Sequence, residues 1–323
     1  MVFFRDNNLW TEKNVVLISD GIKPIDSELL DRLKRRRWTV TQAMPTMEQA
    51  IAAISSPQCS MVMIDDSPEL PAPWVFRNLL QLPITYMTPI IIFLEERNAK
   101  EKMALNSFFT LEIIDKPVVP SKFIDGFEWV IQRWSSGFMG HLRSAGSSFR
   151  LGEKKAAIKT LTEISADKEA APTAAACLSL FFNSTSDFRT AEKVLISALR
   201  QAPRNLGLIL NLVRLYLENA MPYLATRLLK TVTATYGYPK ILCFDMIQSH
   251  LMLNDLNGCI SYIKNMLDSL YMTEILKPCL MKILYAEGYR NEFEKMVASD
   301  PKIIEKFEKT WGKHELAQPP KAS

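Results

Sequence analysis

The chain has 323 residues, of which 48% are apolar and 23% charged, and its formal net charge is +4. This composition is typical of a globular protein and excludes extended disorder outside the ends, while so small a charge gives no reason to expect a nucleic-acid partner. No apolar run approaches the roughly 20 residues that a membrane helix needs, and no signal-peptide core follows Met1. The five cysteines form no CxxC pair. We therefore expect a cytoplasmic protein with reduced thiols and no membrane span.

The first 134 residues alternate between short apolar runs and amphipathic helical patterns. The expected strands are 15–18, 38–43, 61–64, 89–94 and 111–114, and the expected helices are 27–37, 46–54, 74–82, 100–109 and 121–134. Strict alternation of this kind requires a parallel sheet with right-handed crossovers and helices on both faces. The sequence therefore predicts a five-stranded flavodoxin-like α/β domain over residues 1–134.

Polar side chains gather where these strands end, and in parallel sheets ligands bind at that edge. They are Ser19, Asp20, Asp65, Asp66, Glu95, Asp115 and Lys116. The edge is thus expected to hold carboxylates facing a lysine. A salt-bridge cluster that stabilises the sheet edge is one interpretation, and a reactive carboxylate is the other.

Three short stretches, "VVLISD", "MVMID" and "IIDKP", resemble the receiver domains of bacterial response regulators over residues 13 to about 134. The resemblance implies that Asp65 is the phosphoacceptor and that Lys116 pairs with the phosphoryl oxygens. It also implies an Mg²⁺ site formed by Asp20, Asp65 and the carbonyl of Ser67, which suits a cation that prefers oxygen ligands.

The same segment departs from the receiver pattern at four positions. Ser19 replaces the first acid of the metal-binding pair, and Glu95 adds negative charge near an anion site. Leu94 replaces a hydroxyl residue that bonds the phosphoryl group, and Ile113 replaces an aromatic residue that moves with it. A switch needs contacts that differ between its states. The favoured interpretation is therefore a degenerate receiver that requires no cofactor.

The second half repeats with a period of 34 residues. Ala157, Ala191, Ala225 and Cys259 fall at this interval, and so do Leu161, Leu195, Leu229 and Ile263. A helix–turn–helix period of 34 resembles the tetratricopeptide repeat, whose small residues lie where two helices cross closely. We expect a repeat superhelix over residues 135–311, with four repeats near 138–273 and a cap. The tail 312–323 is expected to be flexible.

The first helices of such repeats line a concave groove that binds protein partners. By this resemblance the groove residues are Phe149, Asn183, Leu210, Arg214, Phe244, Gln248 and Met252. The alternative is that several of them pack between repeats. Trp129, Trp134 and Phe138 join the halves and predict a packed junction with limited interdomain motion.

These features predict a non-enzymatic signalling adaptor that binds protein partners through its repeat groove, with self-association of the receiver-like part as a further interaction. The alternative is a two-component response regulator in which phosphorylation of Asp65, with Mg²⁺, controls partner binding. An enzyme is disfavoured because the sequence contains no Gly-rich phosphate loop and no nucleophile elbow.

Overall fold

The computed structural model describes residue 10 and residues 13–19, 27–43, 47–67, 70–95, 99–268, 273–286 and 288–299. The chain divides into two compact units, Met1–Asp245 and Met246–Ser323. The predicted α/β segment and the first helical repeats belong to the same unit.

Five parallel strands form the sheet, as the sequence predicts. They are β1 (Asn14–Ile18), β2 (Thr39–Ala43), β3 (Met61–Asp65), β4 (Ile90–Leu94) and β5 (Leu111–Asp115), in the order β2-β1-β3-β4-β5. This is the flavodoxin-like order, in which the strand sequence reverses beside β1. Strands β3 and β4 are buried along their whole length because helices cover both faces.

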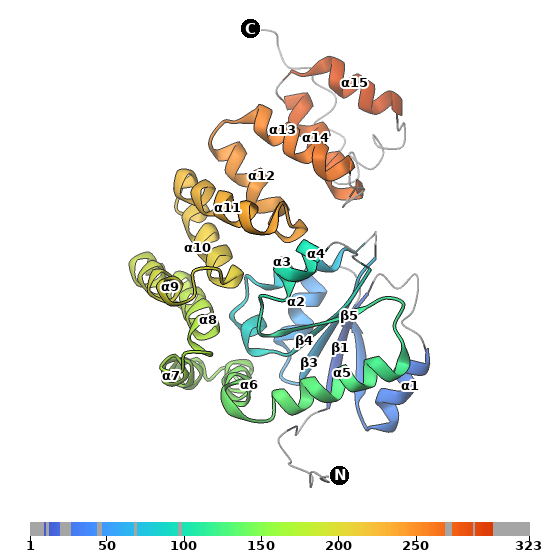
Figure 1. Ribbon diagram of the computed structural model, residues 1–323, viewed down its shortest axis with the longest axis vertical. Helices are drawn as coiled ribbons and strands as arrows, with labels where there is room; N and C mark the ends of the chain where they lie inside the picture. The colour runs from blue at the N-terminus through green and yellow to red at the C-terminus, as the bar shows by residue number, and fades with distance from the viewer. Residues whose placement is uncertain are drawn as a thin grey trace. The chain divides into compact units, whose positions relative to one another are not determined.

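Helices cover the sheet on both sides (Figure 1). They are α1 (Ser27–Arg35), α2 (Met47–Ser55), α3 (Ala72–Leu79), α4 (Ala99–Leu105) and α5 (Pro120–Arg133). Helices α1 and α5 contact each other on one side, and α2 and α3 contact each other on the opposite side. Phe93 of β4 packs on Phe123 of α5, which in turn packs on Phe127, so aromatic rings fill the core beneath α5.

A short 3₁₀ helix, η1 (Pro83–Met87), separates α3 from β4. The sequence pattern predicts one helix over 74–82, whereas α3 begins at Ala72 and ends at Leu79. Proline lacks a main-chain N–H, so Pro83 starts a new turn where its missing donor costs nothing. Residues 84–87 of η1 are buried although the segment connects two other elements.

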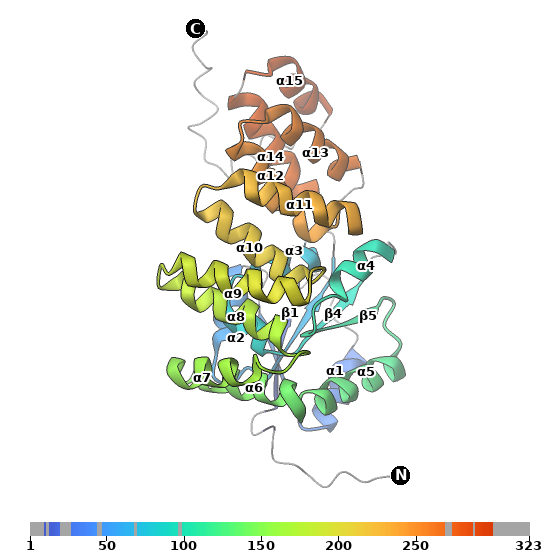
Figure 2. The same ribbon diagram turned by 60° about the vertical axis from the view of Figure 1, so that its left-hand side comes forward.

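Three helical hairpins follow the sheet and stack in chain order (Figure 2). They are α6 (Gly137–Arg150) with α7 (Lys154–Ile164), α8 (Ala171–Ser184) with α9 (Phe188–Gln201), and α10 (Leu206–Glu218) with α11 (Pro222–Tyr236). The repeat columns explain this packing. Ala157, Ala191 and Ala225 are all fully buried, as expected of small residues where two helices cross. The predicted helical repeats are thus confirmed as a fold.

The chain continues through a 3₁₀ turn, η2 (Lys240–Leu242), into α12 (Cys243–Met252). Helices α13 (Leu256–Asp268), α14 (Thr273–Ala286) and α15 (Arg290–Ser299) belong to the second unit. The predicted closing helix and the tail 312–323 lie outside the described residues. None of the described helices is long and apolar enough to span a membrane.

The junction between the halves is packed at one of its predicted residues and exposed at another. Trp134 is 1% exposed and is among the largest fully buried side chains of the described residues. Trp129, in contrast, is 46% exposed and is covered by the guanidinium of Arg133, whose Cζ lies 4.9 Å from the ring centroid. The indole Nε1 of Trp10 donates to Ser135 Oγ, which ties the start of the described chain to the turn between α5 and α6.

Candidate functional site

The carboxyl edge of the sheet brings Asp65 and Lys116 together, as the sequence predicts. The ammonium of Lys116 lies 2.7 Å from Asp65 Oδ1 and donates to the main-chain carbonyl of Asp66 at 2.5 Å. Glu95 Oε1 is more distant, at 3.7 Å from the same nitrogen. The side chain of Asp65 is 9% exposed and that of Lys116 is 21% exposed. The ion pair is therefore largely shielded from solvent.

The neighbouring carboxylate of Asp66 serves the backbone. Its Oδ1 accepts a hydrogen bond from the main-chain N–H of Ala72 at 2.7 Å, and its Oδ2 accepts one from Glu95 at 3.1 Å. The first bond satisfies an N–H at the start of α3, which has no partner inside that helix. Burial raises the pKa of Asp66, although these two bonds and the charges of Lys240 and Lys116 oppose the shift. Asp66 thus fixes the loops after β3 and β4.

The residues that the receiver resemblance assigns to a metal are only partly placed. Asp20 lies outside the described residues, whereas Asp65 ends β3 and Ser67 follows two residues later. Ser67 Oγ accepts a hydrogen bond from Leu70 N at 3.0 Å, which closes a tight turn. Within the described ranges, no group of three His, Cys, Asp or Glu side chains is arranged to hold a metal ion. The structure thus describes two of the three residues assigned to Mg²⁺, Asp65 and Ser67.

The position next to the ion pair carries no hydroxyl group. Leu94 ends β4, opposite Asp115 of β5, and is 1% exposed. A leucine side chain cannot donate a hydrogen bond. A switch that responds to a phosphoryl group needs a contact that forms in one state and breaks in the other, and Leu94 cannot supply a hydrogen bond of that kind.

The second feature of the site is the surface on which the hairpins meet the α/β part of the first unit. Helices α6 and α8 contact η1 directly, while α7 and α9 lie on the side away from the sheet (Figure 1). The hydroxyl of Tyr86 donates to Asn211 Oδ1 at 3.0 Å, and Asn211 Nδ2 donates to the carbonyl of Ala176 at 2.9 Å. Tyr86 is 3% exposed, and burial raises its pKa far above the usual range. This bond joins η1 to both α8 and α10.

The approach between η1 and α6 depends on a glycine. A Cβ atom at Gly146 would lie 2.7 Å from the carbonyl oxygen of Met87, closer than real contacts allow. One turn later, the guanidinium of Arg150 donates to the carbonyl of Ile54 at 3.1 Å and to Thr88 Oγ1 at 2.6 Å. Helix α6 is therefore shaped to fit α2 and η1.

A buried ion pair holds α3 to the start of α12. Arg77 donates from Nε to Asp245 Oδ2 at 2.8 Å and from Nη2 to Asp245 Oδ1 at 2.5 Å, and the two side chains are 9% and 1% exposed. Burial alone would lower the pKa of Arg77, but the charge and hydrogen bonds of Asp245 raise it above its usual value. Such fork-to-carboxylate pairs are strong and geometrically specific.

A second buried guanidinium lies beside this pair. Arg214 Nη1 donates to the carbonyl of Leu80 at 3.1 Å. Burial, with repulsion from Arg77, lowers the pKa of Arg214 to about 10, while Asp245 opposes the shift. Asp245 thus balances the charge of two guanidinium groups.

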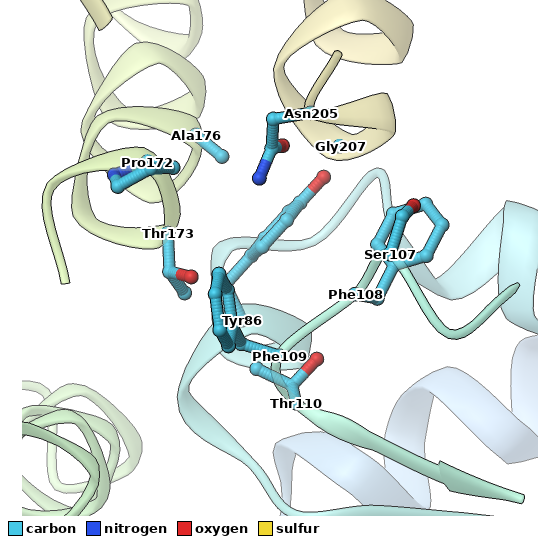
Figure 3. Close-up of a pocket in the computed structure, with 10 residues that line it drawn as sticks. All are labelled: Tyr86, Ser107, Phe108, Phe109, Thr110, Pro172, Thr173, Ala176, Asn205 and Gly207. Carbon is cyan, nitrogen blue, oxygen red and sulfur yellow. The ribbon is translucent and has the colours of Figure 1, made fainter. Parts of the chain in front are cut away.

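A small cleft opens beside Tyr86, between η1, the turn after α4 and the first turns of α8 and α10 (Figure 3). Its cavity volume is about 10 Å³, roughly the space that one water molecule needs. Substrate pockets usually enclose about 300 to 1,000 Å³. The hydroxyl of Tyr86 points toward α10, where a Cβ at Gly207 would lie 3.3 Å from Phe108. This cleft is a packing feature of the contact surface.

The predicted groove residues fall into different environments. Leu210 is 1% exposed, and Arg214 is 7% exposed and bonded to Leu80 within the chain. Phe149 stacks edge to face on Phe181 at 5.3 Å, and Asn183 donates to Glu218 at 2.7 Å. Their contacts are those expected if groove positions pack within the chain.

The remaining three groove residues lie on α12. Phe244 is half-buried, whereas Gln248 and Met252 are exposed. These two side chains are therefore accessible to a partner.

The sheet edge and the hairpins are linked through η2. Glu101 of α4 is 3% exposed and accepts a hydrogen bond from the main-chain N–H of Lys240 at 2.7 Å. The charge of Lys240 also acts on Asp66. The segment that follows α11 therefore packs against α3 and α4.

Comparison with protein-family models, curated proteins and solved structures finds no significant match to the chain. The fold and the contacts above are therefore the basis for inferring function.

Proposed function

We propose that the chain is a non-enzymatic cytoplasmic signalling adaptor, formed from a degenerate receiver-like domain and tetratricopeptide-like hairpins. The observation that carries the proposal is the state of the sheet edge. Lys116 is bonded to Asp65 and to the carbonyl of Asp66, and buried Leu94 supplies no hydroxyl group beside them. An edge held by fixed contacts supports a structural role and gives phosphorylation no state-dependent contact to act on.

The described contact surface supports an adaptor in a second way. Arg214, a predicted groove residue, is hydrogen-bonded to Leu80 inside the first unit, and Tyr86 of η1 is hydrogen-bonded to α10 beside it. The α/β part therefore covers the faces of α6, α8 and α10 that a partner would otherwise contact. Protein partners then bind at positions that remain exposed, among them Gln248 and Met252. Self-association through the receiver-like part is a further interaction in this proposal.

Incubation with a small phosphodonor and Mg²⁺, followed by intact-protein mass spectrometry, tests the proposal. The proposal predicts no stable phosphate adduct on the folded chain. An adduct that forms on the wild-type protein and disappears in Asp65→Asn would overturn it. The Asp115→Asn variant is the matched control, because Asp115 ends the neighbouring strand β5, pairs with Lys102 at 2.5 Å on the surface, and its loss would leave a genuine Asp65 adduct in place.

The alternative is a phosphorylation-controlled response regulator, and one observation favours it. Lys240 follows the third hairpin, its main-chain N–H is bonded to Glu101, and its charge acts on Asp66 beside Asp65. A phosphoryl group on Asp65 would add about −1.5 to −2 charges next to this link. In this alternative, Mg²⁺ held by Asp20, Asp65 and the Ser67 carbonyl would offset the repulsion between the carboxylate and the incoming phosphoryl group.

A further inference from the structure

The outer surface of the second and third hairpins carries exposed cations on two helices. We name this set the outer cationic face, and it consists of Arg189, Lys193 and Arg200 on α9 with Arg227 and Lys230 on α11. Between residues 150 and 240 the chain has thirteen lysines and arginines against seven acids, so this segment has a larger positive charge than the whole chain's +4. The excess charge of the protein is therefore concentrated on the hairpins.

The repeat places these cations in register. Lys159, Lys193 and Arg227 follow one another at intervals of 34 residues, and all three are exposed. On α9, Arg189, Lys193 and Arg200 share one helical face because they are separated by four and seven residues. Equivalent positions of stacked hairpins present equivalent faces, so the cations form an ordered row.

These five cations outnumber the acids of their own two helices, in which Glu192 is the one carboxylate. None of the five forms an ion pair with a residue in the described ranges, and α11 contains no Asp or Glu at all. Glu192 of α9 is engaged elsewhere, because it accepts a hydrogen bond from Tyr216 at 2.8 Å. Exposed cations of the α/β part are often paired, as Arg32 is with Glu28 at 2.6 Å.

Apolar side chains adjoin the charges at the start of α11. Tyr223 is 80% exposed, Leu224 is 42% exposed and Met221 is 38% exposed. Tyr223 lies four residues before Arg227, so the two side chains share one face of the helix. Tyrosine, methionine and arginine are the residue types enriched in protein interfaces, and tyrosine and arginine are frequent hot spots.

We propose that the outer cationic face, together with Tyr223 and Leu224, binds an acidic segment of a partner protein that also carries apolar side chains. Charge complementarity identifies this occupant, and the exposed tyrosine and leucine call for apolar groups beside its acids. A nucleic acid fits less well, because its phosphates are continuous and would also meet the exposed carboxylate of Asp187 at the start of α9.

The inference deepens the proposed adaptor function and rests on it. The α/β part covers the inner faces of α6, α8 and α10. The outer helices α9 and α11 therefore provide the surface of the hairpins that a partner can reach. A phosphate adduct on Asp65 would overturn the proposed function and leave the charge complementarity of the outer face untouched. The two proposals can thus fail separately.

Fluorescence anisotropy on the full chain tests the inference, with a short labelled peptide of repeating Glu-Glu-Leu as the probe. The double variant Lys193→Glu/Arg227→Glu should weaken binding by about tenfold or more, since two attractions become repulsions. The matched double variant Lys34→Glu/Arg35→Glu makes the same charge change on exposed residues of α1 and should weaken binding less than about threefold.

A second variant and two other probes complete the test. Tyr223→Ser keeps every charge and should weaken peptide binding by about threefold to tenfold. The inference is overturned if the peptide does not bind, or if both double variants lose affinity equally. It is also overturned if single-stranded DNA or anionic lipid vesicles bind more tightly than the peptide and show the same loss in Lys193→Glu/Arg227→Glu.

Discussion

Neutralising Asp245 should destabilise the first unit strongly. In Asp245→Asn the guanidinium of Arg77 keeps its burial and loses a bidentate carboxylate partner. Arg214 loses the opposing charge of Asp245 at the same time and still repels Arg77. Removing one partner of a buried pair typically costs about 3 to 5 kcal/mol, and the second guanidinium places the expected loss toward the upper part of that range.

Urea unfolding followed by tryptophan fluorescence measures this loss. Five of the six tryptophans lie in the first unit, at positions 10, 38, 74, 129 and 134. Glu28→Gln is the matched control, because Glu28 pairs with Arg32 at 2.6 Å on the surface and its loss should cost only about 0.5 kcal/mol. A loss below about 1 kcal/mol in Asp245→Asn would refute the electrostatic argument.

Replacing both partners of the buried ion pair should be less costly than removing one of them. The variant Arg77→Met/Asp245→Leu removes one cation together with the carboxylate that pairs with it, so neither member of the bidentate pair is left unpaired. Apolar replacement of a buried pair is often neutral. The double variant should therefore be more stable than Asp245→Asn, and the same unfolding measurement compares the two.

Three other predictions concern the contact surface and the thiols. Tyr86→Phe leaves Asn211 Oδ1 without its donor and should cost about 1 to 3 kcal/mol in urea unfolding, where no change would contradict the bond. Gly146→Val forces a side chain onto the Met87 carbonyl and should lower stability by about 1 to 3 kcal/mol in the same measurement. Of the five cysteines, Cys279 alone is not fully buried, so a thiol reagent at pH 8 should modify it first; rapid reaction of the other four would contradict their burial.

The sheet and the hairpins could be predicted from the sequence because their signals are local or periodic. Apolar runs such as "PIIIFL" mark strands covered on both faces, and the fixed interval of 34 residues marks the small positions that Ala157, Ala191 and Ala225 occupy at 0% exposure. Asp65 and Lys116 meet at 2.7 Å because parallel strands end at one edge.

The contacts that α3 and η1 make with the hairpins and with the start of α12 could not be predicted in this way. Arg77 and Asp245 are separated by 168 residues, and neither belongs to a local motif. In an amphipathic helix an arginine ordinarily indicates the solvent side, yet tertiary packing buries Arg77. The 3₁₀ helix η1 was missed because its five residues are too few to show a period, although Pro83 marks its start.

Hydrogen–deuterium exchange on the full chain tests most directly whether the α/β part packs against α6, α8 and α10 in solution. We expect slow exchange in the peptide 80–88 and in peptides from α8 and α10 of the wild-type protein. We also expect that all three regions gain exchange together in Asp245→Asn. Rapid exchange of 80–88 in the wild-type protein, with α8 and α10 still protected, would contradict the account.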